Sequence, residues 1–293
     1  MTEPQLVELY RSCDLLINMA GATKLHEQHL AAPLRVMLHT DPGAAELRLA
    51  NDDAYTKVAF AQHDIIATCG ENIGNPDCLL PLNGLEAKYR TTRQAVDTEL
   101  WQMAFDADAI AFTTIGNWKQ TGSDVGYRGE VYRWSKHYEW LKFIDLPRRT
   151  GQRFEAALKI DDGDRQKLLS SGWSVIPTNW STDVFGAYPD YIRRSRGSWT
   201  VSKDQYTRLR TGWFSDREAT YLASGKPVIA QETGFSKTLP TGRGLFHFST
   251  MNEILAAIDA INSDYRSHCE AAREIAREYF DASKIARALL REI

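Results

Sequence analysis

The feature that most constrains this chain is a repeated alternation of short apolar runs with longer polar stretches. In the first half, apolar runs cover residues 14–21, 33–41, 64–70 and 78–84, and each ends in Gly or Asp. Runs of this length, followed by turn residues, are typical of buried parallel strands with loops at their carboxyl ends. The pattern predicts half of a doubly wound α/β sheet.

A second alternation fills the rest of the chain. Strand-like runs cover residues 109–118, 172–178, 198–203, 226–234 and 244–248. Helical patterns cover residues 152–160, 216–224 and 251–261, and the last segment is helical with an interruption near Phe280 and Asp281. This rhythm predicts a second parallel sheet with helices on both faces.

The length of 293 residues is sufficient for two domains. Segment 86–102 is rich in charge and has no strand pattern, so we place the crossover between domains there. We expect a short N-terminal domain over residues 1–95, a C-terminal domain over 96–275, and a final helix over 276–293 that packs back on the first domain.

Composition excludes several classes of protein. A net charge of −3 with 25% charged residues gives no basic excess for nucleic acid. The start of the chain lacks a secretory signal pattern, and no run reaches the roughly 20 apolar residues of a membrane span. Four cysteines without CxxC spacing indicate reduced thiols, so we expect a cytoplasmic protein without a metal site.

The sharpest motif covers residues 212–258. Ser215 or Asp216 can cap a helix, and the unpaired amides of a helix start favour an anion such as phosphate. The helix ends at Gly225, and the following strand leads into the loop 232–235. Loops of this kind at the carboxyl edge of a parallel sheet form the ligand crevice of α/β proteins.

The order of these elements resembles the donor-domain end of GT-B glycosyltransferases. The architecture is similar over about residues 105–290, and the segment GWFSDREATYLASGKPVI looks like an uncharacterised bacterial group related to the CgeB-like set. The resemblance implies two Rossmann-like, doubly wound parallel-sheet domains. It also implies a nucleotide-diphosphate sugar, with a UDP-sugar slightly favoured, held by the C-terminal domain without metal or other cofactor, and an acceptor hydroxyl on the N-terminal side.

The motif departs from the family at one point. The two glutamates that usually contact sugar and ribose fall on Gly212 and Thr220 here. Arg217 is therefore our candidate for the diphosphate, and Glu218 for a sugar hydroxyl. The remaining donor candidates of this region are Ser215, Asp216, Thr233, Gly234 and Phe235. An Asp-Arg step that only caps a helix and pairs with surface charges remains the alternative.

Further donor candidates lie upstream. Gly116, Asn117 and Trp118 follow the first strand of the second domain, where Gly permits close approach of a phosphate. Lys136 and Arg149 correspond to the basic pair that neutralises the leaving diphosphate in such enzymes. Trp118 also fits core packing, and the basic and aromatic residues around Lys136 also fit a surface helix.

In the first half, His39 and Asp41 end a strand that faces the cleft, so either could deprotonate an acceptor hydroxyl. The Asp-Pro-Gly sequence also fits a plain turn. A non-catalytic binder of sugar nucleotides is the alternative function, and an epimerase is less favoured because no carboxylates and histidines cluster.

The first half contains fewer strand-like runs than a complete GT-B N-terminal domain, so we expect this domain to be incomplete. Its open strand edges would favour a homo-oligomer. The acceptor is unknown, and the acidic net charge disfavours a nucleic acid.

Overall fold

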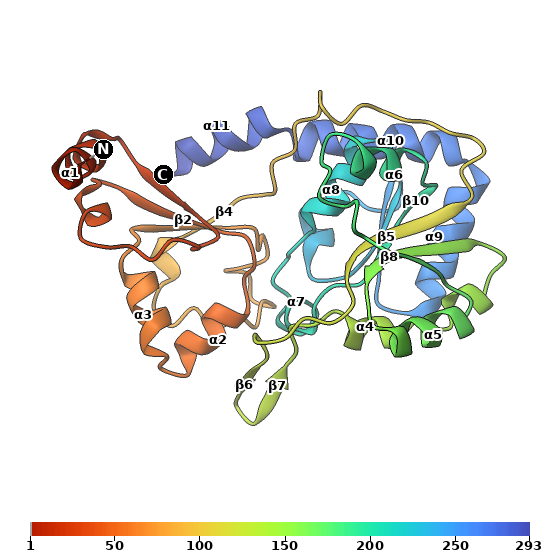
Figure 1. The fold of residues 1–293 in the computed structure, drawn as a ribbon, viewed down its shortest axis with the longest axis horizontal. Coiled ribbons are helices and arrows are strands. Elements are labelled where there is room, and N and C mark those ends of the chain that lie inside the picture. The colour runs from red at the N-terminus through yellow and green to blue at the C-terminus, as the bar shows by residue number, and fades with distance from the viewer. Residues whose placement is uncertain (1) are drawn as a thin grey trace.

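The computed structural model describes residues 2–293 and contains two parallel sheets, one in each half of the chain (Figure 1). The N-terminal sheet has the order β1-β2-β3-β4, and the C-terminal sheet has the order β12-β11-β10-β5-β8-β9. The prediction of two parallel α/β units is confirmed. The strands of the first sheet are β1 Leu16–Met19, β2 Arg35–His39, β3 Ile65–Thr68 and β4 Tyr89–Thr91. Those of the second are β5 Ala111–Asn117, β8 Arg153–Lys159, β9 Ser174–Ile176, β10 Gly197–Thr200, β11 Val228–Gln231 and β12 Leu245–Phe248.

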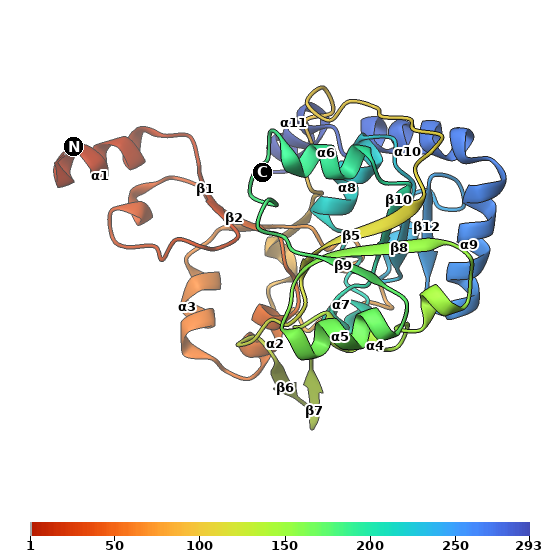
Figure 2. The same ribbon diagram turned by 45° about the vertical axis from the view of Figure 1, so that its right-hand side comes forward.

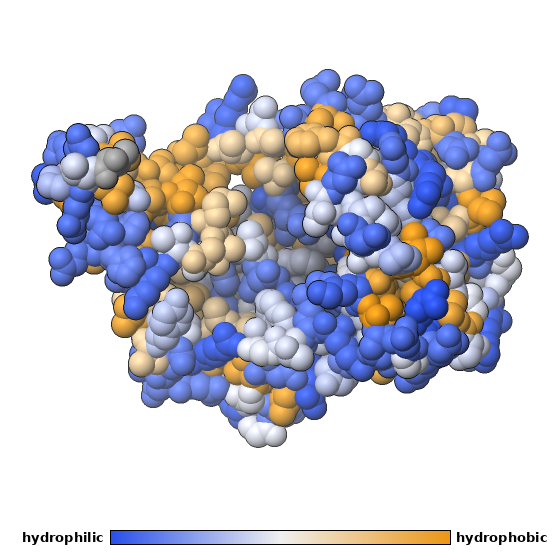
Figure 3. Space-filling view, in the orientation of Figure 1, coloured by the Kyte–Doolittle hydropathy of each residue, from blue (hydrophilic) through white to orange (hydrophobic). Residues whose placement is uncertain are grey.

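The N-terminal sheet buries one face more completely than the other. Met37, Ile66 and Tyr89 point from the sheet into a core that also contains Leu47 and Phe60. The helices of this half are α1 Glu3–Ser12, α2 Ala44–Ala50 and α3 Ala54–Ala61. On the opposite face of β1, Ile17 is 39% and Met19 is 58% exposed. Figure 3 shows hydrophobic side chains gathered over the region where β1, β2 and the C-terminal end of α11 lie in Figure 1.

The C-terminal sheet is covered on both faces. Successive residues of β11 alternate between two cores: Ile229 lies in one, and Val228 and Ala230 lie in the other. This alternation is typical of a doubly wound sheet. The helices of this half are α4 His137–Leu141, α5 Asp162–Ser170, α6 Ala187–Arg193, α7 Asp204–Leu209, α8 Asp216–Ala223, α9 Met251–Ser263, α10 Tyr265–Tyr279 and α11 Ala282–Glu292.

Two local predictions were wrong. The segment 152–160, expected as a helix, contains strand β8, which pairs with β5 on one side and β9 on the other. A central strand buried on both faces has no clean alternation, so its pattern does not distinguish it from a buried helix. The run 78–84, expected as a strand, has no regular structure, and β4 lies instead inside the segment expected as the crossover.

The two halves are joined by segments 92–110 and 280–281, which lie next to each other. Val96 donates its amide to Phe280 O, and Ala282 donates its amide to Val96 O. Beyond this point α11 has no buried residue. No helix among residues 2–293 is long and apolar enough to cross a membrane.

A third, two-stranded sheet projects between the two halves. Its strands, β6 Val125–Tyr127 and β7 Glu130–Tyr132, form an antiparallel hairpin inserted between β5 and α4. Figures 1 and 2 both show this hairpin beside α2 of the N-terminal half. The insertion therefore starts and ends in the C-terminal half but extends towards the N-terminal one.

Candidate functional site

A cavity of ≈ 410 Å³ lies at the carboxyl ends of β5, β8 and β10, beside the start of α8. This is the edge where parallel α/β sheets bind ligands. Seven residues that the sequence predicted as donor ligands line the cavity: Gly116, Asn117, Trp118, Lys136, Ser215, Asp216 and Arg217. The other lining residues are Thr114, Ile115, Gln120, His137, Trp140, Leu158, Thr200, Val201, Lys203 and Trp213.

The end of β5 forms one wall of the cavity. At Gly116 an added Cβ would lie 3.6 Å from Nη1 of Arg217, so the glycine leaves the backbone open beside this guanidinium. Trp118 is only 2% exposed, and its Nε1 donates to Asp164 at 2.8 Å. It also packs edge-on against Trp140. Trp118 is therefore part of the core as well as of the wall.

Arg217, at the start of α8, is held by protein acceptors. Its Nε donates to Glu218 at 2.8 Å and its Nη2 donates to Thr200 Oγ1 at 2.9 Å. Its Nη1 donates to the carbonyl oxygen of Ile115. Burial alone would lower the pKa of Arg217, but the neighbouring Glu218 raises it, so the side chain is a fixed cation. It joins α8 to the ends of β5 and β10 and presents its charge to the cavity.

Lys136 is a cation of a different kind. Among residues 2–293 it has no hydrogen-bond or ion-pair partner, and its Nζ lies 5.2 Å from the centre of the Trp213 ring. Burial and the nearby charges of Arg217 and Lys203 lower its pKa to about 7, while Glu218 and Asp216 act in the opposite direction. An unpaired cation in a cavity with two further cations is a place for an anion.

Lys203 is the third cation and was not predicted. Its Nζ pairs with Asp41 at 3.0 Å and lies 3.1 Å from the centre of the Trp134 ring. Burial lowers its pKa, and Asp41 partly offsets this effect. Its position as the last residue of the strand-like run 198–203 was the signal that could have identified it.

The start of α8 offers fewer free groups than the sequence suggested. Asp216 accepts the amide of Arg217 at 2.8 Å, so its own carboxylate occupies one donor of the helix start. Ser215 precedes the helix and is 4% exposed. Both residues still line the cavity.

Five other donor candidates lie outside the cavity lining. Arg149 is on the surface and pairs with Asp145 at 2.8 Å. It precedes β8 and so lies at the amino edge of the sheet, opposite the cavity. Glu218 is completely buried beneath Arg217. In the loop after β11, Thr233 Oγ1 donates to Trp213 O, and Phe235 packs against Phe214. The fifth candidate, Gly234, is described next.

Two glycines explain the close contact between the halves. An added Cβ at Gly212 would lie 2.3 Å from Asn72 N, and one at Gly234 would lie 3.0 Å from Asn72 Nδ2. Both residues also have positive φ, at 77° and 104°. The position where the resemblance implies a glutamate therefore has no room for any side chain.

His39 and Asp41 are both bound to other side chains. His39 Nε2 lies 2.7 Å from Glu46 Oε1, and Glu46 also accepts Tyr89 OH and the amide of Gly43. Burial would lower the pKa of His39, but Glu46 raises it above its usual value. Burial would raise the pKa of Asp41, but Lys203 and a hydrogen bond from Tyr206 lower it. Neither side chain lines the cavity.

The chain matches no protein-family model, and no curated protein matches it in sequence. Solved structures are similar in fold. Sucrose-phosphate synthase from Thermosynechococcus elongatus matches with a TM-score of 0.58 at 12% identity, over 98% of this chain and 76% of that one. A glycosyltransferase from Rickettsia africae matches with a TM-score of 0.58 at 12% identity, over 98% of this chain and 78% of that one. Anabaena HepE in complex with UDP matches with a TM-score of 0.62 at 12% identity, over 99% of this chain and 80% of that one. The chain therefore has the GT-B fold of glycosyltransferases.

Proposed function

We propose that this protein transfers a sugar from a nucleoside-diphosphate sugar to an acceptor hydroxyl, without a metal ion. The observation that carries the proposal is the unpaired Lys136 in the cavity at the carboxyl edge of the C-terminal sheet. Lys136, Lys203 and the fixed Arg217 together supply the positive charge that a diphosphate needs. The sugar nucleotide is thus assigned to the C-terminal half.

In the proposed reaction the bond between sugar C1 and the β-phosphate oxygen breaks, and a bond between C1 and the acceptor oxygen forms. Negative charge grows on the departing diphosphate, and the cations around the cavity stabilise it. We assign the acceptor proton to the departing diphosphate, because His39 and Asp41 are held by Glu46 and Lys203. The N-terminal half is proposed to hold the acceptor.

UDP is the first nucleotide to test, because HepE, which shares the fold, has been solved in complex with UDP and with UDP-glucose. The engaged state of His39 and Asp41 favours one alternative, a protein that binds sugar nucleotides and does not transfer the sugar.

Titration calorimetry with UDP, GDP and TDP, followed by an assay of UDP release from UDP-glucose, tests both functions. Binding with turnover supports the transferase, and binding without turnover on any acceptor supports the non-catalytic binder. If none of the three nucleotides binds, both proposals fail. Lys57→Ala is a suitable control for charge, because Lys57 pairs with Asp52 on the surface, away from the cavity.

A further inference from the structure

The hairpin β6–β7 packs in the core of the half to which it does not belong in sequence. Val125 is 5% exposed and lies in the same apolar cluster as Met37 and Leu47. Tyr127, Tyr132 and Trp134 pack against that cluster. The first strand of an insertion from the C-terminal half therefore contributes to the N-terminal core.

Polar contacts fix β6 and the segment that leads into it to α2. Arg48 Nη2 donates to Gly122 O at 3.1 Å, and Asn51 Nδ2 donates to Gly126 O at 2.6 Å. Both side chains belong to the end of α2, and both acceptors are backbone carbonyls of the insertion. These two hydrogen bonds join the N-terminal half to the hairpin without involving a residue that lines the cavity.

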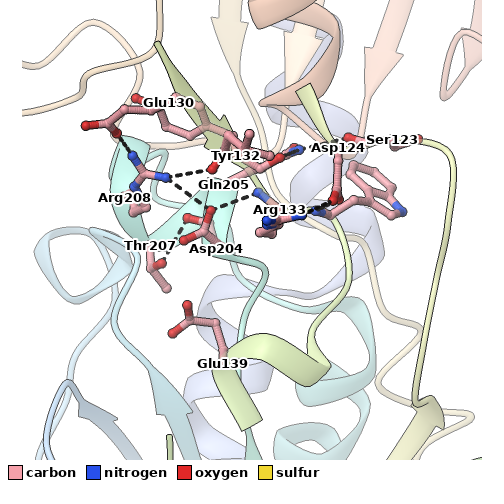
Figure 4. Close-up of polar contacts among 12 residues, drawn as sticks. Ser123, Asp124, Glu130, Tyr132, Arg133, Glu139, Asp204, Gln205, Thr207 and Arg208 are labelled. Atoms are coloured by element: carbon pink, nitrogen blue, oxygen red, sulfur yellow. Dashed lines mark hydrogen bonds and ion pairs between the residues drawn. The ribbon is translucent and has the colours of Figure 1, made fainter. Parts of the chain in front are cut away.

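The other side of the hairpin rests on α7 (Figure 4). Gln205 donates to the carbonyl oxygens of Ser123 and Tyr132 at 3.0 and 3.2 Å. Arg208 donates to Val131 O, pairs with Glu130 and lies over the Tyr132 ring. The hairpin is thus held between α2 of one half and α7 of the other.

The base of the same insertion forms the cavity wall. Five cavity-lining residues lie where the insertion begins and ends. Those at its beginning are Asn117, Trp118 and Gln120, and those at its end are Lys136 and His137. Ser135 joins the two arms, because its hydroxyl accepts Gln120 N at 3.0 Å and contacts Trp118 O at 3.4 Å. The Arg133 amide donates to Asp204, and the Trp134 amide donates to Asp124. These hydrogen bonds hold the segment that connects the hairpin to Lys136.

We propose that the β6–β7 hairpin couples the orientation of the N-terminal half to the position of Lys136, with Arg48 and Asn51 as positioning residues for the donor cavity. The β6 side of the hairpin moves with α2, and the base of the insertion carries the cation that meets the diphosphate. Loss of the two anchors loosens the base without removing any group from the cavity. The inference deepens the proposed function and rests on it for the identity of the ligand.

The test compares the double variant Arg48→Ala/Asn51→Ala with Lys88→Ala. Lys88 donates to His63 O at 2.7 Å and to Phe60 O, so its loss removes hydrogen bonds of the same kind inside the N-terminal half only. We expect the double variant to bind UDP about fivefold more weakly, and Lys88→Ala to bind like the wild type. Unchanged UDP affinity in a folded double variant would overturn the coupling.

Hydrogen exchange without nucleotide separates this inference from the proposed function. The amides of Trp118, Gln120, Arg133 and Trp134 are protected by the contacts described above or by Lys159 O. We expect them to exchange faster in the double variant and not in Lys88→Ala. If exchange changes as expected while UDP fails to bind even to the wild type, the coupling stands and the proposed function falls. Unaltered exchange at these amides refutes the coupling whatever the protein binds.

Discussion

The two halves of this molecule differ in how completely their sheets are covered, and the cavity lies in the better-covered half. The C-terminal sheet has six strands with a core on each face. The N-terminal sheet has four strands and leaves Ile17 and Met19 exposed, and its core includes Val125 of the hairpin. The comparison teaches that the cavity is lined by residues of one half alone, while the core of the other half depends on a segment from across the junction.

The largest expected effect is on the C-terminal core. Trp199 is 1% exposed and packs against Trp140, Trp173 and Phe248. We expect Trp199→Ala to lower the free energy of unfolding by about 3–5 kcal/mol, because the surrounding rings cannot close the space. Met19→Ala on the exposed N-terminal face should cost less than about 0.5 kcal/mol. Urea denaturation measures both, and equal losses would contradict the difference between the halves.

Removal of the unpaired cation should affect ligand binding and not the fold. We expect Lys136→Ala to weaken UDP binding about 30-fold, the magnitude of one lost charged hydrogen bond of about 2 kcal/mol. Calorimetry measures the affinity, and circular dichroism checks the fold. An affinity within twofold of the wild type would remove Lys136 from the site.

UDP affinity should also depend on pH through Lys136. Because the pKa of Lys136 is about 7, its charge is lost as the pH rises through neutrality. We expect binding to be about tenfold weaker at pH 8.5 than at pH 6. Lys136→Arg keeps its charge throughout and reports the titration of the ligand alone. A wild type with the same pH profile as this variant would exclude Lys136 as the titrating group.

The same lysine should lower stability. Folding lowers the pKa of Lys136 from 10.5 to about 7. Between these two values the unfolded chain binds more protons than the folded protein. The contribution of Lys136 to the free energy of unfolding therefore rises with pH over this range. Below pH 7 the folded state carries the full cost of a partly desolvated charge beside Arg217 and Lys203. We expect Lys136→Met to raise the Tm at pH 6 by about 2 °C. A lower Tm in differential scanning calorimetry would show that the charge is not unfavourable in the free protein.

The smallest effect should come from Arg149, which pairs with Asp145 at the amino edge of the sheet. We expect Arg149→Ala to leave UDP affinity unchanged within about twofold, since exposed pairs contribute little. A loss comparable to that of Lys136→Ala would mean that the nucleotide extends to the opposite edge of the sheet.

The sequence predicted the part of the site that follows from local pattern. Gly116 and Lys136 line the cavity and were selected because a strand end and a basic segment mark them, and Arg217 because it begins a helix. Lys203 and Trp213 also line the cavity, and both contact residues of the N-terminal half. No local sequence pattern predicts such contacts between the halves. Arg149 was misplaced because β8 was predicted as a helix, which hid that this residue precedes a central strand. Glu218 and Thr233 belong to the predicted motif, but both are completely buried: Glu218 pairs with Arg217, and Thr233 donates its hydroxyl to Trp213 O.

The prediction for the N-terminal half was correct in fold and incomplete in detail. Its parallel strands were recognised at β1, β2 and β3, whereas the very short β4 lacks a pattern of its own. His39 and Asp41 do end a strand and its loop, but their partners Glu46 and Lys203 come from other elements. A sequence alone does not show that a candidate base is already paired with another side chain of the protein.

The most direct test of the account is a crystal structure of the protein with bound UDP. We expect density for the diphosphate in the cavity, within hydrogen-bond distance of Lys136 Nζ and beside Lys203 and the start of α8. Density for the nucleotide at any place outside this cavity would contradict the assignment of the donor site.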